Sequence, residues 1–185
     1  MINNPWNEIK ISDYKNHMSN ENVYQLQALN TIIEEQTEAV CIDGKRKYIV
    51  AILGITDGNG LEHINTLKVC EVIGIDINKE YLFQCEKKYQ QLNGILNLHC
   101  IDLMIGKNKA VKLIEKSDLI IADLIIEHVH LNNFIEIIGE LPLKNRTVSC
   151  VIQYNPDGNL VSNSGYEQAF DCLFTIIEEV NEESV

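Results

Sequence analysis

Acidic side chains close three successive apolar runs of this sequence. Asp76, Asp102 and Asp123 each lie at or near the end of such a run. Carboxylates accept hydrogen bonds from hydroxyl and amino groups, so these positions suit a polar ligand. Glu127 and His128 follow Asp123 and could orient an acceptor group or accept its proton. The alternatives are a helix cap at Asp76, a plain loop aspartate at Asp102 and a solvated strand exit at His128.

A glycine-dense turn precedes these acids. The short, β-branched run 49–53 predicts a fully buried strand. Three glycines follow it: Gly54, Gly58 and Gly60. Glycine tolerates positive φ and lets backbone N–H groups approach a ligand. Apolar residues spaced by three over 61–67 predict a helix whose N-terminus faces the loop. Strand, loop and helix would cradle a nucleotide or cofactor, although glycines also turn ordinary connections.

The distance between glycine loop and first acid favours the cradle. Asp76 lies 18 residues beyond Gly58, close to the spacing at which an acid meets a ribose in dinucleotide-binding folds. Asp102 could accept a hydrogen bond from an adenine amino group, with Leu103 and Met104 packing on the base. No Gly-Lys-Ser/Thr ends the loop and no G-x-S-x-G occurs, which excludes a P-loop and a serine nucleophile elbow.

Strands and helices are expected to alternate along the chain. The predicted strands are 49–53, 70–77, 95–101, 118–126 and 147–154, and the predicted helices are 19–36, 61–67, 78–92, 109–116, 133–141 and 165–180. Such alternation indicates a doubly wound, Rossmann-like α/β fold with a mainly parallel sheet flanked by helices. Ligands of these sheets bind at the carboxyl ends of the strands, where the predicted acids lie.

Bulk properties narrow the function classes. The 185 residues fit one domain overall, and the formal charge of −12 makes nucleic acid an unlikely partner. The six cysteines contain no CxxC pair and fall mostly in apolar segments, so we expect no disulfide and no metal site. No apolar run reaches membrane-spanning length and the first residues do not resemble a signal peptide, which predicts a cytoplasmic protein.

Four motifs in order are similar to those of the class I S-adenosylmethionine-dependent methyltransferases. They are GITDG at 54–58, GIDIN at 74–78, CID at 100–102 and ADLIIEHV at 122–129. The resemblance implies S-adenosylmethionine as cofactor, bound by Gly54, Ile55, Thr56, Gly58, Asp76, Ile77, Asp102, Leu103 and Asp123. It also implies a lid or substrate side formed by Tyr14, His17, Met18, Glu127 and His128. Residues 1–40 would then be a lid segment and helix, and residues 41–185 the core.

The sequence departs from this family in three respects. Ile52 stands where the family usually has an acid and Thr56 where it has glycine, so Asp57, Asp123 or Glu127 would have to hold the cofactor's amino group. The family sheet has seven strands ending in a hairpin, and only five are predicted here. We therefore expect a sheet without the C-terminal hairpin, from a chain that could be truncated.

Three functions follow from these observations. The leading expectation is methyl transfer to an unidentified small-molecule or protein acceptor, with no catalytic residue assigned. A strong general base is optional for that reaction, because the protein mainly aligns donor and acceptor. The alternatives are an NAD(P)-binding oxidoreductase and a non-catalytic S-adenosylmethionine-binding module.

Overall fold

A five-stranded, all-parallel sheet forms the centre of the protein. The computed structural model describes residues 4–40, 47–153 and 161–180. The strands are β1 (Tyr48–Leu53), β2 (Val69–Asp76), β3 (Leu96–Cys100), β4 (Leu119–Asp123) and β5 (Thr147–Val151), in the order β3-β2-β1-β4-β5. The predicted Rossmann-like α/β fold is confirmed.

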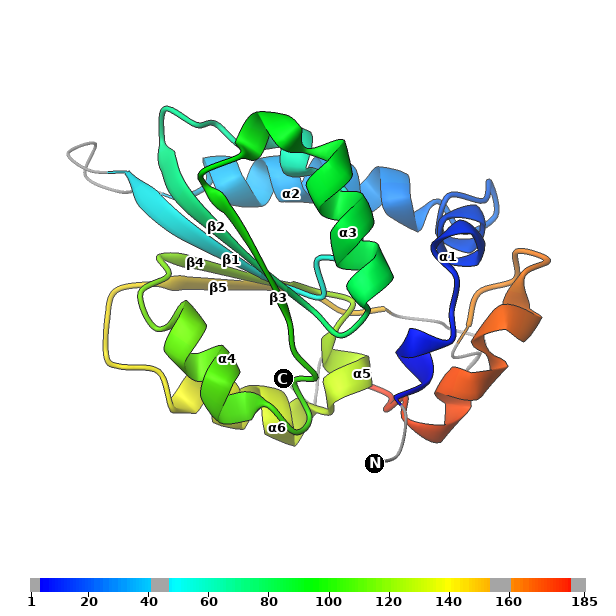
Figure 1. Cartoon of the computed structure of the whole chain (residues 1–185). Coiled ribbons are helices and arrows are strands. Elements are labelled where there is room, and N and C mark those ends of the chain that lie inside the picture. The colour runs from blue at the N-terminus through cyan, green and yellow to red at the C-terminus, as the bar shows by residue number, and fades with distance from the viewer. Residues whose placement is uncertain (1–3, 41–46, 154–160, 181–185) are drawn as a thin grey trace.

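Helices cover both faces of this sheet (Figure 1). The α-helices are α1 (Ile11–Met18), α2 (Gln25–Glu38), α3 (Lys79–Lys88), α4 (Lys107–Ile114), α5 (Ile126–Val129) and α6 (Leu131–Gly139). Four 3₁₀ helices in the described ranges are η1 (Pro5–Asn7), η2 (Leu61–His63), η3 (Gln90–Leu92) and η4 (Glu167–Thr175). No helix in the described part of the chain is long and apolar enough to cross a membrane.

The central strands are apolar on both faces because both faces are buried. Successive side chains of a strand point to opposite sides of the sheet. Val50 and Ile52 of β1 therefore pack in one core, with residues of α3, while Ala51 and Leu53 pack in the other, with residues of α4 and α6. This double burial explains why β1 reads as a continuous apolar run.

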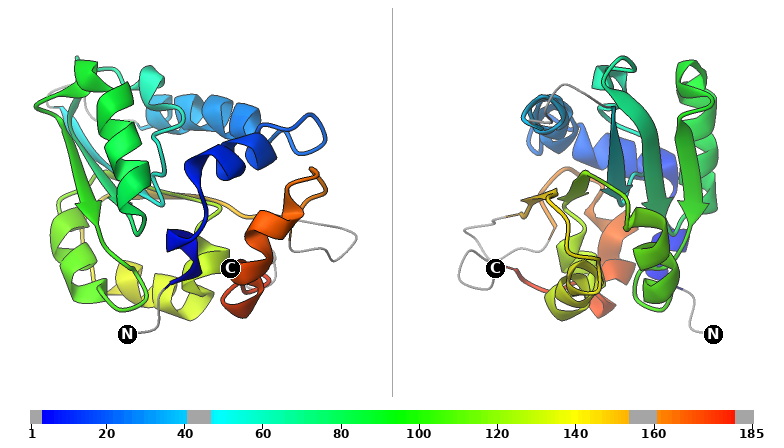
Figure 2. Two further views of the ribbon diagram at one scale, coloured as in Figure 1. Left: turned by 45° about the vertical axis from the view of Figure 1, so that its right-hand side comes forward. Right: turned by 90° about the vertical axis from the view of Figure 1, so that its left-hand side faces the viewer.

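Two terminal segments, residues 4–18 with η1 and α1 and residues 161–180 with η4, lie side by side across the carboxyl ends of the strands (Figure 2). Their apolar residues form a third core cluster. His17 of α1 is hydrogen-bonded through Nδ1 to Ser164 Oγ at 2.6 Å, and the Asn20 side chain donates to the Ser164 carbonyl. Segments that are far apart in sequence thus close the same end of the sheet.

The predicted helix over 61–67 is wrong. The chain forms only the 3₁₀ turn η2 there, and Leu67 is 82% exposed, so the spacing of three does not mark a buried face. Helix α2 instead packs against this segment: a Cβ on Gly60 would lie 2.9 Å from Ile33 Cβ. The connection from β1 to β2 therefore passes the sheet without an α-helix of its own.

Other boundaries also differ from the prediction. The fourth strand ends at Asp123 because Leu124 adopts a left-handed φ of 52°, and α5 follows. The helix expected over 78–92 ends at Lys88, and the one expected over 165–180 is the 3₁₀ helix η4. Buried Phe170 and Leu173 in η4 are three residues apart, as a 3₁₀ helix requires. The predicted end of the last strand, Tyr154, lies outside the described residues.

Candidate functional site

Three strand ends meet around Gly54. In the ladder Leu53 pairs with Ile75 of β2, and Ile52 pairs with Ile121 of β4. Continuing both registers places Gly54 between Asp76 and Asp123. The sequence-predicted acids of these two strands therefore flank the first glycine of the loop.

A pocket of about 190 Å³ opens at this edge of the sheet. Almost all the predicted site residues line it. On the predicted cofactor side these are Gly54, Ile55, Thr56, Asp76, Ile77, Asp102, Leu103 and Asp123, and on the predicted lid and substrate side Tyr14, His17, Met18, Glu127 and His128. The topology thus brings together residues that are far apart in sequence.

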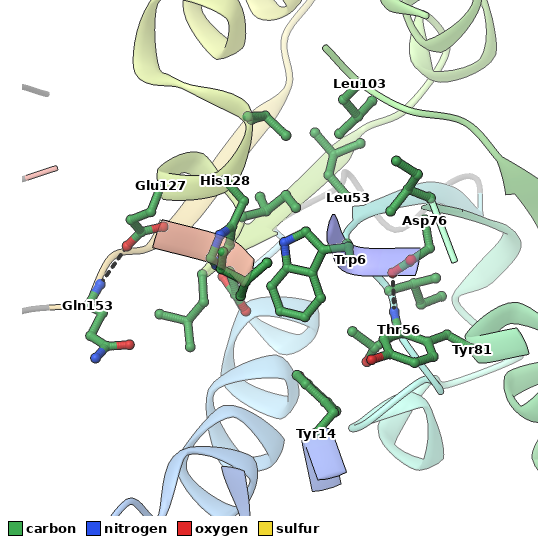
Figure 3. A pocket seen from close by; sticks show the side chains of 18 of the residues that line it. Trp6, Tyr14, Leu53, Thr56, Asp76, Tyr81, Leu103, Glu127, His128 and Gln153 are labelled. Carbon is green, nitrogen blue, oxygen red and sulfur yellow. Dashed lines mark hydrogen bonds between the residues drawn. The ribbon is translucent and has the colours of Figure 1, made fainter. Parts of the chain in front are cut away.

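Asp76 connects the end of β2 to the glycine loop. Its Oδ2 accepts the Thr56 N–H at 2.9 Å (Figure 3), and its Oδ1 accepts the Asn78 N–H at 2.8 Å. Burial raises the pKa of this carboxyl to about 6, although the backbone hydrogen bonds act in the opposite direction. Each carboxylate oxygen has two acceptor sites, so both keep capacity for a ligand hydroxyl.

Two non-glycine residues beside the pocket, one of them in the loop that Asp76 holds, have left-handed backbone conformations. Thr56 has a φ of 51°, and Leu124, which follows β4, has a φ of 52°. Both residues line the pocket. Non-glycine residues in this region cost free energy and cluster at functional sites. At Gly54, with a φ of 72°, a Cβ would lie 3.0 Å from Ile125 Cδ1, so glycine permits the close approach of the two loops.

Gly58 does not line the pocket, although the resemblance implied a cofactor role. A Cβ there would lie 2.7 Å from Cys85 Sγ and 2.8 Å from the Tyr89 ring. Both of these residues belong to the core that lies between the sheet and α3. Gly58 therefore permits the loop to pack on α3.

Asp102 is bonded to two parts of the chain. Its Oδ1 accepts the Met104 N–H at 2.8 Å, as in a turn, and its Oδ2 accepts from the Asn4 side chain at 3.4 Å. Leu103 beside it is buried and lines the pocket. Both readings of Asp102, a turn aspartate and a ligand contact, are compatible with this position.

Asp123 presents one oxygen that has no hydrogen-bond partner among the described residues. Gln36 Nε2 donates to its Oδ1 at 2.9 Å, while Oδ2 is buried and has no hydrogen bond among the described residues. Burial raises the pKa of Asp123 to about 6. Buried acceptors are usually satisfied, so an orphan oxygen at a pocket indicates a missing donor.

Glu127 and His128 repeat this pattern in α5. Glu127 Oε1 accepts the Gln153 N–H at 2.7 Å, but its Oε2 has no partner in the described part of the chain. His128 Nδ1 likewise has none there, and burial lowers the pKa of His128 to about 4, which keeps the ring neutral near pH 7. Its ring lies 4.9 Å from that of Trp6, edge to face.

The predicted lid residues are packed and hydrogen-bonded. Tyr14 and Met18 are buried in the cluster of the terminal segments, and burial raises the pKa of Tyr14. Burial lowers the pKa of His17, which is bonded to Ser164.

Asp57 does not line the pocket: its carboxylate pairs with Lys15 Nζ of α1 at 2.9 Å. Asp57 is therefore not available for the cofactor's amino group.

The predicted residue set omitted three polar residues of the site. Trp6 lies between Asp76 and His128 (Figure 3) and its Nε1 has no partner among the described residues. The Gln36 side chain donates to Asp123, and Gln153, which lines the pocket, donates its backbone N–H to Glu127. Trp6 is the only tryptophan of the sequence, which was a usable signal. No spacing pattern marks the two glutamines.

The charge of the pocket is one-sided. Six described lining residues carry carboxyl groups: Asp76, Asp102, Asp123, Glu127, Glu178 and Glu179. None of the described lining residues is Lys or Arg. This arrangement favours a cationic or hydrogen-donating ligand over a phosphorylated one.

Comparisons with known proteins identify the fold. No protein-family model and no curated protein matches the sequence. A phosphoethanolamine N-methyltransferase of Haemonchus contortus, in complex with S-adenosyl-L-methionine, matches with a TM-score of 0.61 and 12% identity over 92% of this chain and 38% of that one. The CurJ carbon methyltransferase matches with a TM-score of 0.59 and 16% identity, over 88% of this chain and 42% of its own.

A third structure carries a different reaction name. A precorrin 8w decarboxylase of Methanobacterium thermoautotrophicum matches with a TM-score of 0.52 and 17% identity over 83% of this chain and 73% of that one. The chain therefore shares the Rossmann-like α/β fold of these structures, two of which are methyltransferases. It spans less than half the length of the two methyltransferases above. At these identities the likeness defines the fold and leaves the reaction to the site.

Proposed function

We propose that this protein binds S-adenosylmethionine and transfers its methyl group to a small-molecule or protein acceptor. One observation carries the proposal: the ends of β1, β2 and β4 converge on a pocket with carboxylates on both sides of Gly54 and no described Lys or Arg. S-adenosylmethionine carries a sulfonium, an ammonium and a carboxylate, which leaves it with a net positive charge, and it supplies an activated methyl group.

The residues present fit this cofactor. Asp76 suits the ribose hydroxyls, because each of its oxygens retains an acceptor site beyond the two backbone N–H bonds. Asp123 suits the ammonium group, because its Oδ2 is buried without a described partner. It would replace the acid that the family has at the position of Ile52. Asp102 and Leu103 would contact the adenine.

The chain's own contribution is positioning and exclusion of water. α1 and the segment 161–180 cover the pocket and are joined by the His17–Ser164 bond. In this proposal residues 1–40 supply a lid segment and helix to a core of residues 41–185. Aligning donor and acceptor in a dry site can supply most of the acceleration of a displacement reaction.

Trp6 is expected to respond to the ligand. The pocket of about 190 Å³ is smaller than the roughly 300–1,000 Å³ of typical small-molecule sites. Trp6 lies in its middle, held by the bond from Asn78 Nδ2 to the Trp6 carbonyl. We expect the ring to move aside or to stack on the bound adenosyl group.

An NAD(P)-dependent oxidoreductase is disfavoured by the same structure. Dinucleotide folds hold the pyrophosphate at the N-terminus of the helix that follows the glycine loop. Here a three-residue 3₁₀ turn follows the loop, and carboxylates line the pocket. Non-catalytic binding of S-adenosylmethionine remains the second candidate. It is favoured because the pocket offers unpaired carboxylate oxygens to a ligand, while the proposed function assigns no catalytic base.

Calorimetry with S-adenosylmethionine, its demethylated product S-adenosylhomocysteine, and NAD tests the proposal. We expect the two sulfur ligands to bind and NAD not to bind. Binding of NAD alone would overturn the proposal. If both sulfur ligands bind but labelled donor yields no methylated product in cell extract, the non-catalytic alternative gains.

A further inference from the structure

Glu127 forms the end of the pocket that lies away from Asp76. The two acids are on opposite sides of Trp6 in Figure 3. The proposed cofactor contacts at Asp76, Asp102 and Asp123 leave Glu127 unused. Glu127 comes from α5, which begins three residues after β4, so it is fixed to the sheet edge rather than to a terminal segment.

The carboxylate of Glu127 is half satisfied. The side chain belongs to a residue that is 6% exposed, and its Oε1 accepts the Gln153 N–H at 2.7 Å. Its Oε2 is buried and has no hydrogen-bond partner among the described residues. A buried, unpaired carboxylate oxygen is costly, so a ligand donor at this position would relieve that cost.

The nearby lysines that could bind an anionic ligand form ion pairs outside the pocket. None of the described lining residues is Lys or Arg, and Lys15 and Lys88 pair with Asp57 outside the pocket. An acceptor with a phosphate or carboxylate group would meet several acids and no counter-charge. The Glu127 end therefore selects for a positive or hydrogen-donating group.

Apart from its acids, the pocket that Glu127 shares is lined largely by apolar and aromatic side chains. Phe170 and Leu173 are among them, and the Trp6 ring lies beside His128. Aromatic faces attract cations as well as apolar groups. The wall thus suits a small molecule with an apolar body and one amino group.

We propose that the methyl acceptor is a small amine with an apolar body, whose amino group binds the Glu127 carboxylate. This inference rests on the proposed methyl transfer and names its acceptor class. Acceptors that would present a phosphate or carboxylate to Glu127 are then excluded.

The reaction balances with Glu127 as proton acceptor. The bound ammonium gives one proton to the Glu127 carboxylate, which leaves a lone pair on nitrogen. That pair forms the N–C bond to the methyl carbon, and the pair of the broken C–S bond stays on sulfur, which becomes neutral. The product nitrogen carries the positive charge, and the proton on Glu127 passes to solvent on release. Burial raises the pKa of Glu127 and so improves it as a proton acceptor.

The test compares matched ligands on three proteins. Phenethylamine, 2-phenylethanol and phenylacetate share one skeleton and differ in the polar group, and short alkylamines with their carboxylic acids form a second series. Binding is measured by calorimetry and by fluorescence of Trp6, with the protein alone and with saturating S-adenosylhomocysteine. The proteins are wild type, Glu127→Gln and the control Glu136→Gln, which changes an exposed acid of α6 paired with Lys107.

We expect amines to bind at least tenfold more tightly than the matched acids and to be methylated when the donor is supplied. Glu127→Gln retains the acceptor for the Gln153 N–H but loses the charge, so we expect it to lose this preference while the protein stays folded and its S-adenosylhomocysteine affinity is unchanged. Glu136→Gln is expected to match wild type.

Three results would overturn the assignment. They are equal or tighter binding of the acids, unchanged amine affinity in a folded Glu127→Gln, and failure of every amine to bind protein that binds S-adenosylhomocysteine. If wild type does not bind S-adenosylhomocysteine, the proposed function itself fails and the amine assignment falls with it.

Discussion

Replacing Asp76 by Asn tests both the electrostatics and the proposed role of this residue. Burial raises the pKa of Asp76 from 3.8 to about 6 in the ligand-free protein. A raised carboxyl pKa means that the folded protein binds the proton more tightly than the unfolded chain. Its stabilising contribution is therefore full below pH 3.8 and is lost as pH rises through 6.

The magnitude follows from the shift. At 1.36 kcal/mol per pKa unit, about two units correspond to about 3 kcal/mol, of which about 2 kcal/mol is lost between pH 4 and pH 7.5. Asn does not titrate, so this loss disappears in the variant. Asn also turns an amide group toward one of the two backbone N–H groups, at Thr56 or Asn78, which costs about 1–3 kcal/mol at every pH.

Urea unfolding at pH 4 and pH 7.5 measures the first effect. We expect the destabilisation caused by Asp76→Asn to be about 2 kcal/mol smaller at pH 7.5 than at pH 4. The control Asp171→Asn, at an exposed residue outside the pocket, is expected to show no such difference. Equal destabilisation at both pH values would refute the burial argument.

Titration with S-adenosylhomocysteine measures the second effect. Loss of hydrogen bonds to a charged acceptor costs about 1.5–3 kcal/mol, so we expect affinity to fall about 10- to 100-fold. Asp171→Asn is expected to bind as wild type does. Unchanged affinity in a folded Asp76→Asn would remove Asp76 from the site.

Four further changes test other parts of the structure. Gly58→Ala is expected to destabilise the protein by about 2 kcal/mol in urea unfolding, because the Cβ would meet core side chains and the φ is +83°, while ligand affinity of the folded fraction stays unchanged. Asp123→Asn should weaken S-adenosylmethionine about tenfold in calorimetry and leave adenosine, which has no ammonium group, unaffected. Lys15→Met removes the nearer partner of Asp57 and should speed amide exchange in Ile11–Met18, at a stability cost of about 1 kcal/mol. S-adenosylhomocysteine should change the emission of Trp6, and an unchanged spectrum at saturation would contradict its position in the pocket.

The strand ends were predictable because burial dictates their composition. β1 must be apolar on both sides, and an acid can follow only where the chain leaves the sheet. Since the carboxyl ends of parallel strands lie along one edge of the sheet, Asp76, Asp102 and Asp123 could be expected at that edge. This reasoning needs no knowledge of side-chain contacts.

Contacts between distant segments were not predictable in the same way. Gln36 bonds Asp123 across 87 positions of sequence, and nothing in the composition of α2 indicates that partner. The apolar spacing at Leu61, Ile64 and Leu67 also predicts a helix equally well whether or not another helix occupies that face. Here α2 packs against the first of these turns, where Leu61 is buried, while Leu67 is exposed.

Helix α2 contacts two parts of the site. It packs against the β1–β2 connection, which forms a 3₁₀ turn and no α-helix, so the glycine loop lacks the helix N-terminus that would attract an anion. The described loop therefore offers no helix N-terminus for a phosphate, and the acids that flank Gly54 favour a cation instead. Gln36 of α2 also donates to Asp123 Oδ1, so α2 supports the carboxylate that is proposed to bind the ammonium group. A substitution that unpacks α2 should therefore weaken S-adenosylmethionine more than adenosine.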